Sequence, residues 1–292
     1  ELLKNKVGFK DDLKAFFEYM KETEAFYFPN TEKGRQNYLS QTTTILDSIQ
    51  TKIPALFYIG PKAKLIVKAV ESYREKSVGK AFYETPSLDG SRPGIYYINT
   101  HDMSMMPIYQ MEALAYHEGF PGEHMQTALA QELEYLPRFR RFGSSYTAYT
   151  EGWNLYAELI PKELGFYKDP YSDFGRLAME LWRACRMVVD VGIHSKRWTR
   201  EQSIQFYESN TPNKRSDCIK MVERHMVLPA QATAYKIGMI TILELRQKAK
   251  KALAEKFDIR DFHQVILRHG AVPLQVLEDL VDSYIKTKNK SS

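Results

Sequence analysis

Apolar residues recur at intervals of three and four positions along most of this chain, and this helical periodicity restricts the possible folds more than any other feature. The longest such run covers residues 171–196, in which Leu177, Leu181 and Cys185 share one helical face. The same pattern predicts further helices over residues 11–22, 33–56, 62–76, 108–119, 124–135, 146–164, 214–226, 230–254, 259–268 and 273–287, with another beginning at the capping box of Thr199 and Gln202. The chain is therefore expected to be mainly α-helical.

One region departs from this pattern. Residues 81–84 are short and aromatic, and residues 95–100 read Ile-Tyr-Tyr-Ile-Asn-Thr, a composition that favours β-strands. The stretch between them, residues 88–94, is dense in turn-forming residues. These features predict a small antiparallel β ribbon directly before the helix at 108–119.

Length and composition limit the class of protein. A chain of 292 residues with 43% hydrophobic and 26% charged residues can bury a large core. No apolar run approaches the ~18–20 residues of a membrane span. The net charge of +5 comes from scattered lysines, so nucleic acid is not an expected partner. We expect an N-terminal helical segment, residues 1–78, packed on a site-bearing domain, residues 79–292, as one structural unit. The oligomeric state does not follow from the sequence.

The chemistry concentrates in residues 116–126, Tyr-His-Glu-Gly-Phe-Pro-Gly-Glu-His-Met-Gln. His117 and Glu118 begin as a zinc-peptidase helix begins, with a metal ligand followed by a general base. In that motif a second histidine follows four residues later, one helical turn on, but here Pro121 occupies the position. A metal site in this stretch therefore needs its second ligand from elsewhere.

The next candidates for that ligand are Glu123 and His124. On a straight helix His124 would lie ~10 Å along the axis from His117, which is too far for both to bind one ion. Pro121 interrupts helical hydrogen bonding, and Gly122 permits unusual backbone angles. We expect a break at these two residues that brings His124 or Glu123 back toward His117.

A second acidic motif occupies residues 150–158, Thr-Glu-Gly-Trp-Asn-Leu-Tyr-Ala-Glu. Many zinc peptidases take a further ligand from a glutamate on a later helix, and Glu151 is placed to serve in this way. Glu158 lies seven residues further on the same helical face and could orient a ligand histidine by a hydrogen bond. Either acid alone could equally be a solvated charge on a helix surface.

Together these motifs resemble the bacterial domain-of-unknown-function family 885, whose members are thought to be zinc metallopeptidases. The resemblance rests on His-Glu-x-x-Pro-Gly with the following His and Gln126, and on Glu-Gly-Trp-x-Leu-Tyr-x-Glu. It covers most of residues 80–285 and continues through residues 89–94, 183–194, 198–202, 231–238 and 257–263. The family usually has histidine directly after the Pro-Gly pair, whereas this chain has Glu123 there and His124 next.

The resemblance implies a large multi-helix, gluzincin-like metallopeptidase domain that forms the C-terminal portion of a longer protein. It implies one zinc ion held by His117, Glu151 and either His124 or Glu123, with Glu118 as the base that activates a metal-bound water. The expected substrates are peptides. We expect a periplasmic or cell-envelope location in preference to a cytoplasmic one.

Four further side chains are candidates for supporting roles. Tyr235 and His194 could donate a hydrogen bond to the oxyanion of a tetrahedral intermediate, or could simply be packed residues. Arg183 and Arg186 lie on the long helix predicted to border the site. Either could pair with a substrate carboxylate or form a structural ion pair.

The predicted strand before the metal helix offers a possible substrate contact. If its edge were free, Tyr97 and Asn99 could lie beside an extended peptide bound by main-chain pairing. The tyrosines of this strand could equally belong to the core.

Two functions remain open from the sequence. The first is a zinc-dependent metallopeptidase, a hydrolase that cleaves peptide bonds through a metal-activated water. The alternative is a catalytically degenerate helical peptide-binding or scaffold protein of the same family. A di-metal carboxylate protein is not expected, since no Glu-x-x-His occurs, and neither is a serine hydrolase, since no Gly-x-Ser-x-Gly occurs.

Overall fold

Helices make up most of the computed structural model, which describes residues 1–143 and 146–290. The elements in chain order are α1 (Leu2–Lys6), α2 (Leu13–Glu22), α3 (Glu32–Gln50), β1 (Leu65–Ala69), β2 (Ala81–Glu84), β3 (Gly94–Ile98), α4 (Ile108–Glu118), α5 (Glu123–Glu132), α6 (Arg138–Phe142), α7 (Thr147–Glu163), α8 (Pro170–Lys196), α9 (Arg200–Asn210), α10 (Arg215–Val227), α11 (Gln231–Leu253), α12 (Ile259–Leu267) and α13 (Leu274–Lys290). The mainly helical fold predicted from periodicity is confirmed.

The three strands form one small mixed sheet in the order β1-β3-β2. The predicted antiparallel ribbon is present, because β2 pairs antiparallel with β3. The prediction of a helix over residues 62–76 is wrong. β1 lies there instead and runs parallel to β3, with Leu65 opposite Gly94. Its Leu-Ile-Val run suits a strand as well as a helix, and pairing with a strand almost thirty residues away decides between them.

β3 is the central strand, and this position overturns one substrate hypothesis. Its backbone is paired with β1 on one side and β2 on the other. The free edge on which an extended peptide could add as a further strand is therefore not available at this strand. The tyrosines of β3 are core residues, with Tyr96 fully buried and Tyr97 nearly so.

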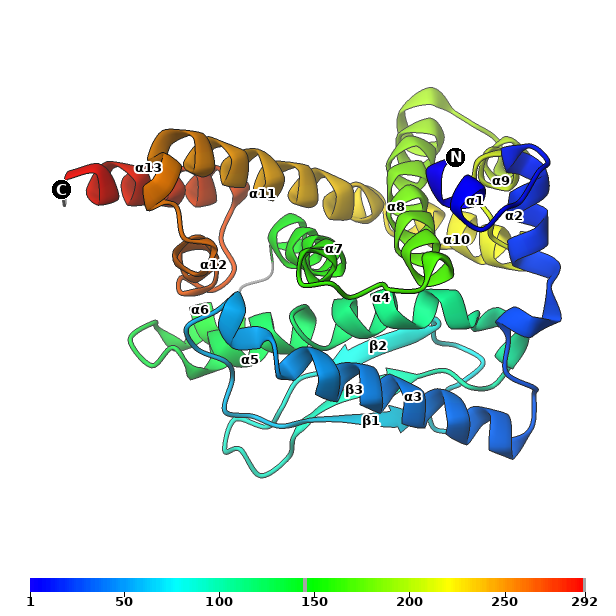
Figure 1. The fold of residues 1–292 in the computed structure, drawn as a ribbon, viewed down its shortest axis with the longest axis horizontal. Helices are drawn as coiled ribbons and strands as arrows, with labels where there is room; N and C mark the ends of the chain where they lie inside the picture. Colours follow the sequence, from blue (N-terminus) through cyan, green and yellow to red (C-terminus); the bar gives the residue numbers. More distant parts are fainter. Residues whose placement is uncertain (144–145, 291–292) are drawn as a thin grey trace.

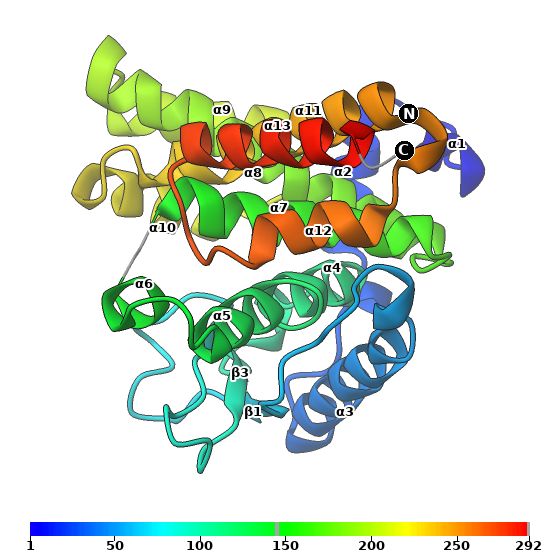
Figure 2. The same ribbon diagram turned by 90° about the vertical axis from the view of Figure 1, so that its left-hand side faces the viewer.

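α4 and α5 lie in the middle of the molecule (Figures 1 and 2), with the sheet and α3 on one side and α7, α8 and α11 on the other. The largest core cluster joins both sides, from Ile98 on the sheet through Met111 on α4 to Trp153 on α7. Because β1 pairs with β3, the predicted boundary between residues 78 and 79 runs through the sheet.

The backbones of α7 and α11 touch where two glycines face each other. A Cβ atom added to Gly152 would overlap the backbone of Gly238, and one added to Gly238 would overlap the carbonyl oxygen of Ala148. Only glycine fits at such a close approach. The contact matters because Glu151 and Tyr235, both candidate site residues, lie within one turn of it.

Within the described residues no single helix is long and apolar enough to cross a membrane. Only the pair Arg215–Val227 and Gln231–Lys256, bent by 96°, reaches the length and composition of a span when its two helices are taken together.

Candidate active site

The helix break predicted at Pro121 and Gly122 separates α4 from α5 and is held in place by α7. α4 ends at Glu118 and α5 begins at Glu123. The indole of Trp153 donates a hydrogen bond to the Pro121 carbonyl at 3.0 Å. A Cβ on Gly122 would overlap the carbonyl oxygen of His117, so the turn folds tightly against the end of α4.

His117, at the end of α4, lies between two carboxylates from α7. Its Nδ1 donates to Glu158 Oε1 at 2.7 Å, and its Nε2 faces Glu151 Oε2 at 3.6 Å. Arg183 on α8 also reaches Glu158 Oε1, at 3.3 Å. Burial alone would lower the pKa of His117, but its contacts with Glu151 and Glu158 raise that pKa to about 10. Without a metal, the imidazole therefore carries a proton on each nitrogen.

Glu118 and Glu123 meet across the break. Burial raises the pKa of both carboxyl groups, and the nearby charges of Glu118 and Glu151 raise that of Glu123 further, well above its usual range. The two groups are in hydrogen-bond contact, so protonated Glu123 donates to Glu118. For Glu151, burial would raise the pKa, but the close contact with the charged His117 lowers it overall.

α8 and α11 close the other side of the cluster. The ring of Tyr235 stacks on that of His117 with centroids 6.3 Å apart, and its hydroxyl interacts with Glu151. The guanidinium of Arg186 covers the Tyr235 ring at 4.2 Å. Gln231 joins them, because its amide nitrogen donates to the Tyr235 hydroxyl at 3.2 Å and its amide oxygen accepts from Arg186 at 3.1 Å. Burial raises the pKa of Tyr235, so its hydroxyl remains a donor at neutral pH.

Four residues around His117 and Glu118 have a buried polar atom without a hydrogen-bond partner among the described residues. These atoms are Tyr96 OH, Glu158 Oε2, Arg183 Nε and Arg186 Nε. Buried polar atoms are normally paired, so these four are free to bond to a bound molecule. Tyr96 also acts electrostatically on Glu118, which places its hydroxyl on the sheet side of the cluster.

His124 does not face this cluster. Its ring accepts a hydrogen bond from the Tyr83 hydroxyl at Nδ1, 2.8 Å away, and donates from Nε2 to the Ala63 carbonyl at 3.1 Å. Burial lowers the pKa of His124 to about 4, so the ring is neutral and both nitrogens are already engaged. The structure thus brings Glu123, and not His124, to the side of His117.

Three other predicted site residues also lie outside the cluster. His194 is ~16 Å along α8 from Arg183 and hydrogen-bonds to the His225 carbonyl at 2.8 Å. Tyr97 stacks on Phe82, on the sheet. The Asn99 amide donates to the Glu75 carbonyl at 2.7 Å. These contacts give all three structural roles.

One residue of the cluster, Gln231, was missed from the sequence. It lies four positions before Tyr235 on α11 and contacts both Tyr235 and Arg186. Helical spacing from Tyr235 would have found it.

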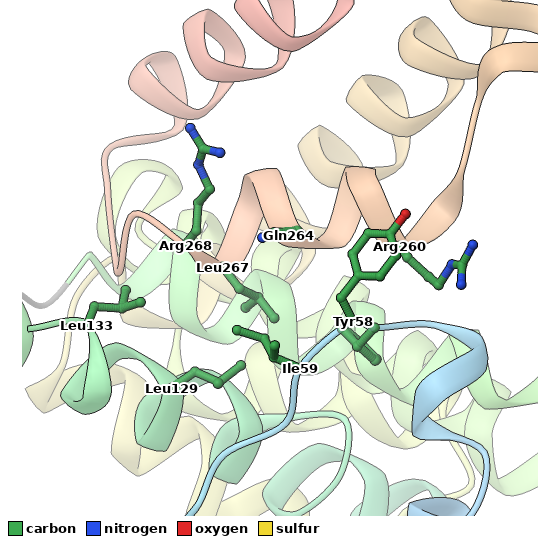
Figure 3. Close-up of a pocket in the computed structure, with 9 residues that line it drawn as sticks. Tyr58, Ile59, Leu129, Leu133, Arg260, Gln264, Leu267 and Arg268 are labelled. Carbon is green, nitrogen blue, oxygen red and sulfur yellow. The ribbon is translucent and has the colours of Figure 1, made fainter. Parts of the chain in front are cut away.

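The apolar hollow shown in Figure 3 lies away from this cluster. Residues 57–59, the end of α5 and α12 form its walls, and its lining includes Leu129, Leu133 and Leu267 with Arg260 and Arg268 at the rim. Among the described residues, none that lines it is an acid, a histidine or a cysteine.

Comparison with known proteins places the chain in a family. The sequence matches the model of the family described as bacterial protein of unknown function, DUF885, over residues 1–281. A solved structure of a proposed lipoprotein from Colwellia psychrerythraea is similar with a TM-score of 0.95 and 39% identity, over 98% of this chain and 49% of that one.

A second solved structure, of a proposed lipoprotein of unknown function from Shewanella oneidensis, shares the fold with a TM-score of 0.78 and 20% identity, over 96% of this chain and 52% of that one. The chain thus spans about half the length of both. No curated protein matches it. The chain belongs to the bacterial family DUF885, whose function is unknown.

Proposed function

We propose that this chain is a metal-dependent hydrolase that cleaves peptide bonds, with a divalent cation, zinc by preference, at His117 and Glu151. The observation that carries the proposal is the 3.6 Å separation of His117 Nε2 and Glu151 Oε2. A charged hydrogen bond would be shorter, at about 2.7–2.9 Å. Two ligand atoms of a tetrahedral zinc ion, each about 2.0–2.2 Å from the metal, lie roughly 3.4 Å apart.

The hydrogen bond of His117 Nδ1, on the other side of the ring, also supports a metal ion at Nε2. Ligand histidines usually donate their second ring N–H to a carboxylate, which fixes the orientation of the ring. Glu158 accepts this bond here at 2.7 Å, and Arg183 holds Glu158 in turn at 3.3 Å. This support shell would keep Nε2 directed toward Glu151 whether or not an ion is bound.

The charge of the cluster also favours a cation. Glu118, Glu123, Glu151 and Glu158 bring four acids together, and the arginines of α8 supply two positive charges. Buried charges must be balanced, and the protonation of His117 and Glu123 does so in the absence of metal. A dication would do the same while releasing those protons.

The third ligand we assign is Glu123. Its carboxylate is electrostatically coupled to both His117 and Glu151. Across residues 1–143 and 146–290, no three His, Cys, Asp or Glu side chains are grouped closely enough to hold an ion as they stand. The donor types nevertheless fit, since an imidazole with carboxylates suits zinc and somewhat harder dications.

Each remaining residue has a task in hydrolysis. The ion would polarise the scissile carbonyl and acidify a water molecule. Glu118, whose pKa burial raises, can take a proton from the attacking water and pass it to the leaving amine. The Tyr235 hydroxyl, protonated at neutral pH, can donate to the oxyanion.

The location we propose is the cell envelope. It is supported by the relative from Colwellia psychrerythraea, which is described as a proposed lipoprotein. Peptides that reach this compartment would be the available substrates.

Elemental analysis of the purified protein tests the proposal. We expect about one zinc ion per chain, lost in His117→Ala and Glu151→Ala but kept in Glu163→Ala, an exposed ion-pair residue on the same helix. Glu118→Gln should keep the metal and lose hydrolysis of a fluorogenic peptide mixture. Absence of metal and of hydrolysis in the folded wild type would refute the enzyme and favour the peptide-binding or scaffold alternative.

A further inference from the structure

α8 carries three buried arginines, and only two of them form ion pairs among the described residues. Arg176 pairs with Asp173 and Glu180, and Arg183 pairs with Glu158. Arg186, which is 5% exposed, makes no ion pair with any described carboxylate. Its Nε also has no hydrogen-bond partner there.

Arg186 acts electrostatically on Glu151 and lowers its pKa, but no described carboxylate lies within ion-pair distance of the guanidinium. A bound anion there would pair with N–H donors that the described residues leave unused. Arg186 has five N–H donors, and within the described residues the hydrogen bond from Nη2 to Gln231 at 3.1 Å uses one of them. The Tyr235 ring packs against the guanidinium at 4.2 Å. Gln231 is only partly buried, so the fork lies next to a part of the cluster that solvent reaches.

The position of Arg186 relates it to the reacting centre. One face of Tyr235 stacks on His117, and the same ring contacts Arg186. The guanidinium is thus about one aromatic ring away from the candidate ligand. The 6.3 Å and 4.2 Å distances to the Tyr235 ring centroid place the guanidinium within about 10 Å of the imidazole. Extended peptide spans roughly 3.3–3.6 Å per residue, so this separation corresponds to at most about three residues of substrate.

We propose that Arg186 binds the free C-terminal carboxylate of a peptide, and that the site therefore removes a short piece, of at most about three residues, from the carboxyl end of its substrates. This inference rests on the proposed function. A planar fork with parallel N–H groups matches a carboxylate bidentately. A singly charged carboxylate also suits a site with Glu123 and Glu151 nearby better than a doubly charged phosphate would.

The test measures binding separately from hydrolysis. Calorimetry on Glu118→Gln protein would compare an N-acetylated tripeptide acid with the same tripeptide as its C-terminal amide. We expect the acid to bind at least ten times more tightly. The preference should vanish in Glu118→Gln/Arg186→Gln and shrink in Glu118→Gln/Arg186→Lys, which keeps the charge but not the fork. Lys196→Gln, an exposed cation on the same helix, should leave it unchanged.

Each outcome separates the two proposals. Equal affinity for acid and amide, or equal hydrolysis of both by the wild type, would overturn the role of Arg186 and leave the hydrolase standing. Binding of inorganic phosphate in place of the peptide acid would also overturn it. A clear preference for the acid with no hydrolysis of any peptide would support the carboxylate site and refute the enzyme. If Arg186→Gln does not fold, as judged by circular dichroism, the Arg186→Lys comparison decides.

Discussion

The substitution Glu158→Gln tests the role of the charge on Glu158, because glutamine has nearly the same shape as glutamate but is neutral. Glu158 is 1% exposed and is the shared partner of His117, at 2.7 Å, and Arg183, at 3.3 Å. Glutamine leaves the buried Arg183 guanidinium without its ion-pair partner. Breaking a buried pair in this way costs about 3–5 kcal/mol of unfolding free energy.

Glu163→Gln is the matched control on the same helix. Glu163 binds Arg246 through both oxygens at 2.7 Å, but its side chain is 44% exposed. A surface pair contributes about 0–1 kcal/mol, so the two variants should differ severalfold in their effect on stability. Urea unfolding followed by circular dichroism measures both.

Metal affinity is a second measurable property, and it should depend on the contact between Glu158 and His117, not on the pairing of Arg183. Losing the partner that orients a ligand histidine typically lowers affinity about 10–100-fold. The double variant Glu158→Gln/Arg183→Met removes the unpaired positive charge and should recover much of the stability. It should not recover the metal affinity, which competition with a chelator would measure. Unfolding free energies within about 0.5 kcal/mol for Glu158→Gln and wild type would refute the assigned role of Glu158.

Three further predictions concern separate parts of the molecule. Burial lowers the pKa of His263 to about 3, so its contribution to stability is complete above pH ~6.5 and is lost as the pH falls toward 3. In His263→Gln, the urea midpoint should therefore decline less steeply between pH ~6.5 and ~3 than in the wild type. An equal decline in both proteins would contradict this. Gly238→Ala should lower the free energy of unfolding, measured by thermal unfolding, by about 1–3 kcal/mol or more, because the added methyl group overlaps the Ala148 carbonyl. Gly79→Ala should leave it nearly unchanged, because the space around its Cβ is open. Tyr235→Phe should lower kcat of the metal-loaded enzyme about 10²–10³-fold with little change in KM; an equal rise in KM would instead indicate a substrate-binding role.

The sequence was sufficient for those parts of the site that depend on local geometry. Pro121 lacks the amide hydrogen that a continuing helix needs, so a break there was predictable. Glu151 and Glu158 are seven positions apart, which places them on one face of α7 wherever that helix packs. The structure brings both to His117.

The choice between Glu123 and His124 depends on tertiary structure instead. Consecutive residues on a helix point about 100° apart, so only one of them can face His117. The contacts of His124 with Tyr83 and Ala63 set the rotation of α5, and both partners are at least forty residues away in sequence. β1 was missed for the same reason, since its strand conformation depends on pairing with β3.

The spacing within the Glu-Gly-Trp motif follows from the position of α7 between two other helices. Glu151 faces His117 on α4, Gly152 lies against Gly238 on α11, and Trp153 binds the Pro121 carbonyl in the break. Three consecutive residues thus contact α11, the turn and His117, each in a different direction. A side chain at Gly152 would push α7 away from α11. Because Glu151 and Trp153 are its neighbours, the same displacement would move the proposed ligand Glu151 and loosen the turn that carries Glu123.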